Sequence, residues 1–422
     1  MRILLLGEYS NVHATLAEGL RQLGHEVTVV SNGDFWKDYP RDIDVSRPKG
    51  RLGGVRLMMR ILHLLPRLRG FDVVQLINPM FFELRAERLI PIYRYLRRHN
   101  GKMVLCAMGM DYYWVHESTY RRPMRYSDFN IGEQIRTDAP AVREQRDWMG
   151  TAKERLNRMI AEDCDAIVAG LYDDYVCYEP NFPQKTHYIP LPIVLLSDER
   201  SVLRDERSVL RDECLELRDV TDEPQRPTIV SQHSTLNSQH PTKVSQHSTL
   251  NSQQKTLNSQ QKKAIRFFIG ISKGRSAYKG TDIMLHALED VKAKYPEEVE
   301  IVKAEGVPFE QYQHMMESCD AILDQLYSYT PAMNALLAMS KGIICIGGGE
   351  PEHYDLLGEH ELQPIINVEP SYESVYAQLE QLVLHPERLP QLKQQSIEYV
   401  NRHHDHLKVS RQYERLYGGD TP

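Results

Sequence analysis

Short apolar runs alternate with amphipathic helical patterns in two long parts of the chain, one before and one after its middle. This alternation restricts the fold more than any other feature. The runs are continuous in apolar character, which is typical of parallel strands covered on both faces. The expected strands cover residues 3–6, 27–30, 73–77, 103–107, 166–169, 265–271, 299–302, 321–323 and 343–346. The pattern predicts an α/β protein with two Rossmann-like doubly wound parallel-sheet domains.

A segment of low complexity separates the two series of strands. DERSVLR occupies residues 198–204 and 205–211, and VSQHSTLNSQ occupies 230–239 and 244–253. Such polar repeats offer little to bury and predict a disordered insertion, with an interaction segment as the alternative. We therefore predict an N-terminal Rossmann-like domain over 1–196, a tandem-repeat insertion over 197–262 and a C-terminal Rossmann-like domain over 263–422.

The charge distribution argues against nucleic acid as a partner. The net charge is −7, residues 1–196 hold 27 Lys and Arg against 24 Asp and Glu, and residues 262–422 hold 16 against 24. No domain is strongly basic, as nucleic-acid binding would require. The six cysteines show no metal-ligand spacing and suggest reduced thiols. We find no secretory leader and no apolar run of membrane-spanning length, and expect a cytoplasmic protein.

A basic, glycine-rich loop follows the expected strand 265–271. It contains Lys273, Arg275 and Lys279, and Thr281 is placed to cap the helix that follows. A helix N-terminus beside cations can neutralise a diphosphate without a metal. The alternative is a surface turn whose charges are solvated.

Other polar residues follow expected strands of the first series, where ligands bind in open α/β sheets. His13 lies in the first helical turn after residues 3–6, and Asp111 follows residues 103–107. A packed histidine and a turn or cap aspartate are the alternatives. Residues 112–148 are polar and aromatic, which suggests long loops over a site.

Two helical patterns, at residues 52–68 and 85–98, interleave apolar residues with arginines. Such helices can lie on an anionic membrane surface, so a weak peripheral contact at the inner face of the membrane is one interpretation. The favoured interpretation is helices packed on the sheet with their arginines in water.

Several pieces occur in an order and spacing that resemble the bacterial GT-B glycosyltransferases, similar to the family-four (glycosyl transferase group 1) retaining enzymes. They are the opening at residues 7–13 followed by ATLAEGL, the linker YIPLPI, the loop GISKGRSAYKG, the loop EGVP before CDAILDQ, and LLAMSKG followed by GGGE. The resemblance implies two Rossmann-like domains facing a cleft, with the acceptor on the N-terminal side and a nucleotide sugar on the C-terminal side.

The resemblance also implies roles for individual residues. Arg275 and Lys279 would bind the donor diphosphate, Val307 would lie near the base, and a helix opening at Thr330 would direct its N–H groups at the phosphates. His13 and Asp111 would be catalytic, facing the sugar and the acceptor. Neither a metal nor a cofactor is expected.

The sequence departs from the family at a pair of glutamates, which are replaced by Tyr329 and Leu337. Neither side chain can act as a carboxylate acceptor; Asp324 and Glu350 are candidate substitutes. The expected function is transfer of a sugar from a nucleotide-diphosphate sugar to a glycan or lipid-linked acceptor, with retention, as in polysaccharide biosynthesis. The alternatives are a nucleotide-sugar epimerase of the same architecture and a catalytically degenerate binding protein.

Overall fold

The computed structural model describes residues 1–195, 264–271 and 276–420. The predicted insertion over 197–262 lies outside the described residues, as does Arg275.

The first sheet has seven parallel strands in the order β3-β2-β1-β4-β5-β8-β9. They are β1 (Arg2–Leu6), β2 (Glu26–Ser31), β3 (Ile43–Asp44), β4 (Val73–Leu76), β5 (Lys102–Ala107), β8 (Ala166–Ala169) and β9 (Thr186–Tyr188). From β1 the chain first adds β2 and β3 on one side, and then adds β4, β5, β8 and β9 on the other side. The reversal at β1 and β4 creates a crevice at the carboxyl ends of these strands, where a ligand can enter.

Alternate residues of the first sheet enter two separate cores, because successive side chains of a strand point to opposite faces. Leu4 and Leu6 pack with α2 (Gly53–Leu64), α3 (Ala86–His99) and α6 (Ala152–Asp163). Ile3 and Leu5 pack with α1 (Val12–Gln22) and with α16 (His406–Gly418). Both faces are therefore covered, as the continuous apolar runs predicted.

The second sheet has five parallel strands in the order β11-β10-β12-β13-β14. They are β10 (Ile265–Ile271), β11 (Val299–Glu305), β12 (Ala321–Leu323), β13 (Ile344–Gly347) and β14 (Ile366–Asn367). The flanking helices are α9 (Ser276–Lys279), α10 (Thr281–Lys294), α11 (Phe309–Glu317), α12 (Met333–Met339), α13 (Pro351–Leu357), α14 (Tyr372–Leu384) and α15 (Leu389–His403). The two-sheet α/β architecture predicted from the sequence is thus confirmed.

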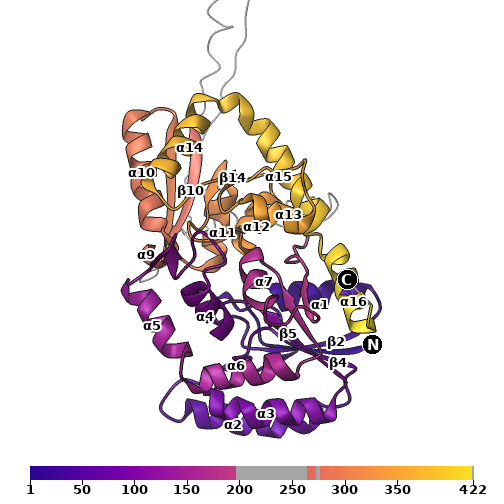
Figure 1. Cartoon of the computed structure of the whole chain (residues 1–422). Coiled ribbons are helices and arrows are strands. Elements are labelled where there is room, and N and C mark those ends of the chain that lie inside the picture. Colours follow the sequence, from indigo (N-terminus) through magenta and orange to yellow (C-terminus); the bar gives the residue numbers. More distant parts are fainter. Residues whose placement is uncertain (196–263, 272–275, 421–422) are drawn as a thin grey trace, which may run out of the picture. The chain divides into compact units, whose positions relative to one another are not determined.

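The last helix packs on the first sheet although it follows the second in sequence. Helix α16 lies beside α1, near the N-terminus (Figure 1). The Tyr417 hydroxyl donates to Gln75 of β4 at 2.7 Å, and the Lys102 ammonium donates to the carbonyl of Leu416 at 2.8 Å. Residues 406–418 therefore contribute to the core of the first sheet.

Residues 112–148 are not the long loops that their polarity suggested. They contain α4 (Tyr112–Tyr120), the hairpin β6 (Asn130–Ile131) and β7 (Gln134–Ile135), and α5 (Ala139–Trp148). Asp111 accepts a hydrogen bond from the N–H of Trp114, and Asp138 from that of Ala141, so each aspartate caps a helix. A further short helix, α7 (Tyr172–Tyr178), follows β8.

Two expected helix starts are also wrong. Thr281 does not cap α10: Gly280 takes the cap position with φ 72°, and the Thr281 hydroxyl pairs with that of Ser276 at 2.9 Å. The helix expected from Thr330 begins at Met333 instead. The N–H of Ala332 binds the Asp324 carboxylate at 3.1 Å, which holds the preceding backbone outside the helix.

No helix among the described residues is both long and apolar enough to cross a membrane.

Candidate functional site

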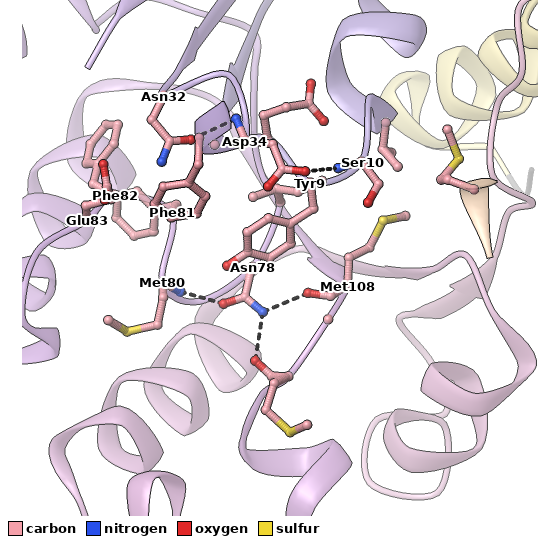
Figure 2. A pocket seen from close by; sticks show the side chains of 18 of the residues that line it. Tyr9, Ser10, Asn32, Asp34, Asn78, Met80, Phe81, Phe82, Glu83 and Met108 are labelled. Atoms are coloured by element: carbon pink, nitrogen blue, oxygen red, sulfur yellow. Dashed lines mark hydrogen bonds between the residues drawn. The ribbon is translucent and has the colours of Figure 1, made fainter. Parts of the chain in front are cut away.

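A cavity of 610 Å³ opens at the carboxyl ends of β1, β2, β4 and β5 (Figure 2). Loops after these strands form most of its wall, and α5, α6 and the start of α7 add residues. Ala332 and Met333 of the second sheet's half complete the lining. Its volume lies within the range of small-molecule sites. A ligand held here would contact both halves of the structure.

The cavity wall combines aromatic rings with carboxylates. The rings belong to Tyr9, Phe35, Phe81, Phe82 and Trp148, and the carboxylates to Glu8, Asp34, Glu83, Glu144 and Asp174. Lys37 and Lys153 are the cations of this wall. Aromatic faces beside acceptor groups suit a ligand with apolar C–H faces and many hydroxyl donors.

Glu8 places a buried carboxyl group at the N-terminus of α1. Its two oxygens accept hydrogen bonds from the N–H groups of His13 at 3.3 Å and Ala14 at 2.8 Å. Burial raises the pKa of Glu8 to about 8, against the lowering effect of these two N–H groups. Glu8 is therefore a candidate proton donor at neutral pH.

The loops after β1 and β2 are strained and joined to each other. Ser10, Asn11, Asp34 and Phe35 all have positive φ, between 54° and 73°, which is uncommon for residues with a side chain. The N–H of Ser10 donates to Asp34 at 2.9 Å (Figure 2). The Lys37 ammonium contacts the same Asp34 carboxylate at 2.6 Å. Strain of this kind clusters at ligand sites, where surrounding contacts maintain it.

Asn78 orders the part of the cavity wall that the loops after β4 and β5 form. Its amide nitrogen donates to the carbonyls of Met108 at 2.8 Å and Met110 at 3.2 Å, and its oxygen accepts from the N–H of Met80 at 2.9 Å (Figure 2). The loops after β4 and β5 are thereby tied together.

Asp174, in the first turn of α7, carries a buried oxygen that lacks a partner. Asp174 is 6% exposed, and its Oδ2 atom has no hydrogen-bond partner among the described residues. Burial raises the pKa of Asp174 well above its ordinary value, and the charges of Asp111, Asp173 and Asp128 act in the same direction. An unsatisfied buried carboxyl in a cavity wall calls for a ligand group or a proton.

His13 does not line the cavity. It is fully buried, and its Nδ1 lies 2.8 Å from the carbonyl oxygen of Gly7, so Nδ1 carries the proton. Nε2 lies 3.2 Å from the amide nitrogen of Gln75, which donates to it. Burial lowers the pKa of His13 to about 4, so the ring is neutral at neutral pH. Its contacts support the loop that carries Glu8.

Asp111 lies directly after the cavity residues Gly109 and Met110 but does not itself line the cavity. Its oxygens accept from the N–H of Trp114 at 2.8 Å and from the hydroxyl of Tyr178 at 2.5 Å. Burial raises the pKa of Asp111 to about 6, partly opposed by these bonds.

The residues that were predicted to bind the donor lie in different places and make different contacts. Lys279 is half-buried at the end of α9, where its charge lowers the pKa of Asp324 and of Asp128 against the larger effect of burial. Val307 follows β11 and packs, partly buried, in the core beside α11. Neither lines the cavity.

Thr330 belongs to a loop of the second half that is bound by Asp173 of α7. One Asp173 oxygen accepts from the Thr330 hydroxyl at 2.9 Å, and the other accepts from Ser328 Oγ and from the N–H of Tyr329, both at 3.0 Å. These bonds connect the two halves beside the cavity.

Glu350 lies next to Tyr329, the first of the two positions where the family pattern has glutamate. The N–H of Glu350 donates to the carbonyl of Tyr329 at 3.3 Å. The Glu350 carboxylate contacts Arg125 Nη2 at 2.5 Å and also accepts from the Tyr126 hydroxyl. A carboxylate is therefore present at this place, but residues of the first half engage it. Leu337 packs as a partly buried core residue.

Sequence reasoning missed Glu8 and Asp174. The signal for Glu8 was its position directly after Gly7, in the loop between β1 and His13. Asp174 had no comparable signal, because Asp173 and Asp174 are adjacent and only packing separates their roles.

No protein-family model matches this sequence, and a comparison with curated proteins finds no match. Solved structures do match it. HepE of Anabaena, in complex with UDP and glucose, is 11% identical with a TM-score of 0.52, over 99% of this chain and 100% of that chain. Sucrose-phosphate synthase of Thermosynechococcus elongatus is 11% identical with a TM-score of 0.52, over 99% of both chains. A Listeria monocytogenes protein assigned as a UDP-N-acetylglucosamine 2-epimerase is 9% identical with a TM-score of 0.50, over 99% of this chain and 95% of that chain.

At these identities the likeness concerns the fold alone, and it covers both sheets. The chain therefore has the GT-B fold of two Rossmann-like domains, as the sequence resemblance implied.

Proposed function

We propose that this protein is a glycosyltransferase that moves a sugar from a nucleotide-diphosphate sugar to a glycan or lipid-linked acceptor. The observation that carries the proposal is the cavity of 610 Å³, whose wall combines loops of the first sheet with Ala332 and Met333 of the second half. A two-substrate transfer needs both substrates in one enclosed place. The cytoplasmic location expected from the cysteines belongs to the same proposal.

Glu8 and Asp174 are the proposed acid and base groups of the cavity. Burial raises the pKa of Glu8 to about 8 and raises the pKa of Asp174 well above its ordinary value, so each carboxyl group holds a proton more readily than an exposed one. The unpartnered Oδ2 of Asp174 suits a hydroxyl group of the acceptor or of the transferred sugar. His13 and Asp111 remain proposed catalytic residues from the resemblance; in the structure they support the loops next to the cavity.

Arg275 and Lys279 are proposed to stabilise the diphosphate as it leaves, with Val307 and Thr330 nearby and Glu350 as the carboxylate for a sugar or ribose hydroxyl. Developing charge on a leaving group is best stabilised by cations held in place beforehand. Retention of configuration and independence from a metal ion are part of this proposal.

Two other functions have one observation each in their favour. Two raised-pKa carboxyl groups in one cavity also suit an epimerase, which must remove and return a proton. A degenerate binding protein is favoured by Thr330 and Glu350, whose side chains are already engaged by Asp173, Arg125 and Tyr126.

The discriminating experiment has two stages. Thermal-shift screening of nucleotide sugars would first identify the donor, because a ligand that binds only the native state raises the melting temperature. Nucleotide release is then measured with and without glycan or lipid-linked acceptors. Acceptor-dependent release supports a transferase, and sugar isomerisation without an acceptor supports an epimerase. Binding without either reaction indicates a degenerate protein, and no binding overturns the proposal.

A further inference from the structure

Helix α2 is apolar on two opposite sides. Leu57, Ile61 and Leu64 face the core beneath the first sheet. At 100° per residue, a second set lies on the opposite side of the helix. Its members are exposed: Leu52 by 60%, Val55 by 60%, Met59 by 63% and Leu62 by 48%. A helix on the surface of a globular protein usually presents polar residues on that side.

The same region is strongly basic in a protein of net charge −7. Residues 45–71 contain seven Arg and Lys and no Asp or Glu. All seven cations are exposed: Arg47, Lys49, Arg51, Arg56, Arg60, Arg67 and Arg69. Within the described part of the chain, Arg60 alone of these is in an ion pair, with Asp44 at 3.7 Å. Arg56 and Arg60 lie on one flank of the exposed apolar face.

We propose that this α2 face binds the surface of a bilayer containing anionic phospholipid. The four exposed apolar side chains would enter the boundary between headgroups and acyl chains, and the arginines would contact lipid phosphates. Burial of apolar area together with attraction to anionic lipid is what holds interfacial helices on membranes. The proposal goes beyond the glycosyltransferase assignment and does not depend on it.

Charge favours a membrane over a second copy of the chain. In a twofold dimer through this face, each patch would meet its own copy. The cations that flank this face, Arg56 and Arg60, would then lie close to the same cations of the second copy, and this repulsion between like charges is unfavourable. An anionic lipid surface neutralises them instead.

The test is sedimentation of the full chain with vesicles of equal parts phosphatidylcholine and phosphatidylglycerol, and separately with phosphatidylcholine alone. We expect binding to the anionic vesicles that weakens sharply between about 0.1 M and about 1 M salt, as the charges become screened. Arg56→Gln with Arg60→Gln should weaken binding about thirtyfold, since each cation near such a surface contributes about a fivefold factor. Val55→Ser with Met59→Ser should weaken binding by about tenfold or more.

A matched control is Leu384→Ser with Arg411→Gln, which removes an exposed apolar side chain and an exposed cation far along the chain from α2. This control should bind vesicles as the wild type does. Melting curves of all variants should be unchanged, because the substituted side chains are exposed.

Several outcomes would overturn the proposal: no binding, equal binding to both vesicle types, or unchanged binding by both α2 variants. A dimer abolished by Val55→Ser with Met59→Ser would instead assign the face to self-association. Nucleotide-sugar binding, measured by calorimetry, should be the same for these variants as for the wild type. Failure of the membrane proposal is thereby distinguished from failure of the proposed function.

Discussion

Glu8 allows a direct test of how burial and helix position compete for one carboxyl group. Two N–H groups at the start of α1 favour its ionised form, as does the positive end of a helix. Burial favours the neutral form and is the larger effect, so the pKa rises from 4.5 to about 8. The native protein then retains this proton up to about pH 8, whereas the unfolded chain loses it near pH 4.5.

Unfolding therefore releases a proton between these pH values, and raising the pH favours the unfolded state. The contribution of Glu8 to stability should fall by about 1.4 kcal/mol per pH unit over this window, or about 5 kcal/mol in total. Glu8→Gln removes the titration at every pH but keeps only one of the two acceptor oxygens, because its amide nitrogen cannot accept a hydrogen bond. We expect the stability of the variant relative to the wild type to rise progressively from pH 4.5 toward pH 8.

The assay is urea denaturation at half-unit pH steps, with the free energy of unfolding compared between variant and wild type. Glu8→Ala separates the hydrogen bonds from the titration, because it leaves the N–H groups of His13 and Ala14 unpaired. That variant should lose a further 1–3 kcal/mol, roughly, relative to Glu8→Gln at every pH. A difference between Glu8→Gln and wild type that stays flat, or that shifts in favour of the wild type with rising pH, would show that Glu8 is ionised and that the helix terminus outweighs burial.

Three further predictions concern Asp174, Lys279 and His13. Asp174→Asn should lower kcat by about a hundredfold or more without lowering the melting temperature. Asp173→Asn should lower the melting temperature, because Asp173 accepts three hydrogen bonds from the loop at 328–330. Equal losses of melting temperature in the two variants would contradict these different roles. Lys279→Ala should lower kcat/KM by about a hundredfold, and Lys273→Ala should change it little; equal, salt-sensitive losses would indicate a nonspecific basic loop. His13→Ala should lower turnover more than donor affinity, and calorimetry showing that donor binding is abolished would overturn this.

The positions of most strands were predictable because each of them carries its own signal, whereas β3, β6, β7, β9 and β14, of two or three residues each, were not predicted. The runs at 265–271, 166–169 and 321–323 match β10, β8 and β12 at both ends. Their apolar side chains are buried on both faces, so local composition reports the final environment. Helix starts were less predictable. The backbone before α12 is fixed by Asp324, a residue eight positions away, which no local pattern can indicate.

The candidate site was likewise predictable only in part. The sequence placed polar residues at the carboxyl ends of the strands, and the cavity lies there. It could not distinguish His13, which is buried against Gly7 and Gln75, from Glu8, which lines the cavity.

The sequence by itself determined the two-sheet α/β fold, because strand and helix periodicities are local properties of the chain. Tertiary structure alone decided which carboxyl groups have raised pKa values, since burial depends on distant segments. It also decided that Asp173 is fully bonded while its neighbour Asp174 keeps an unpartnered oxygen. Finally, it decided that α2 exposes an apolar face, because only the packed structure shows which of its two apolar sides meets the core.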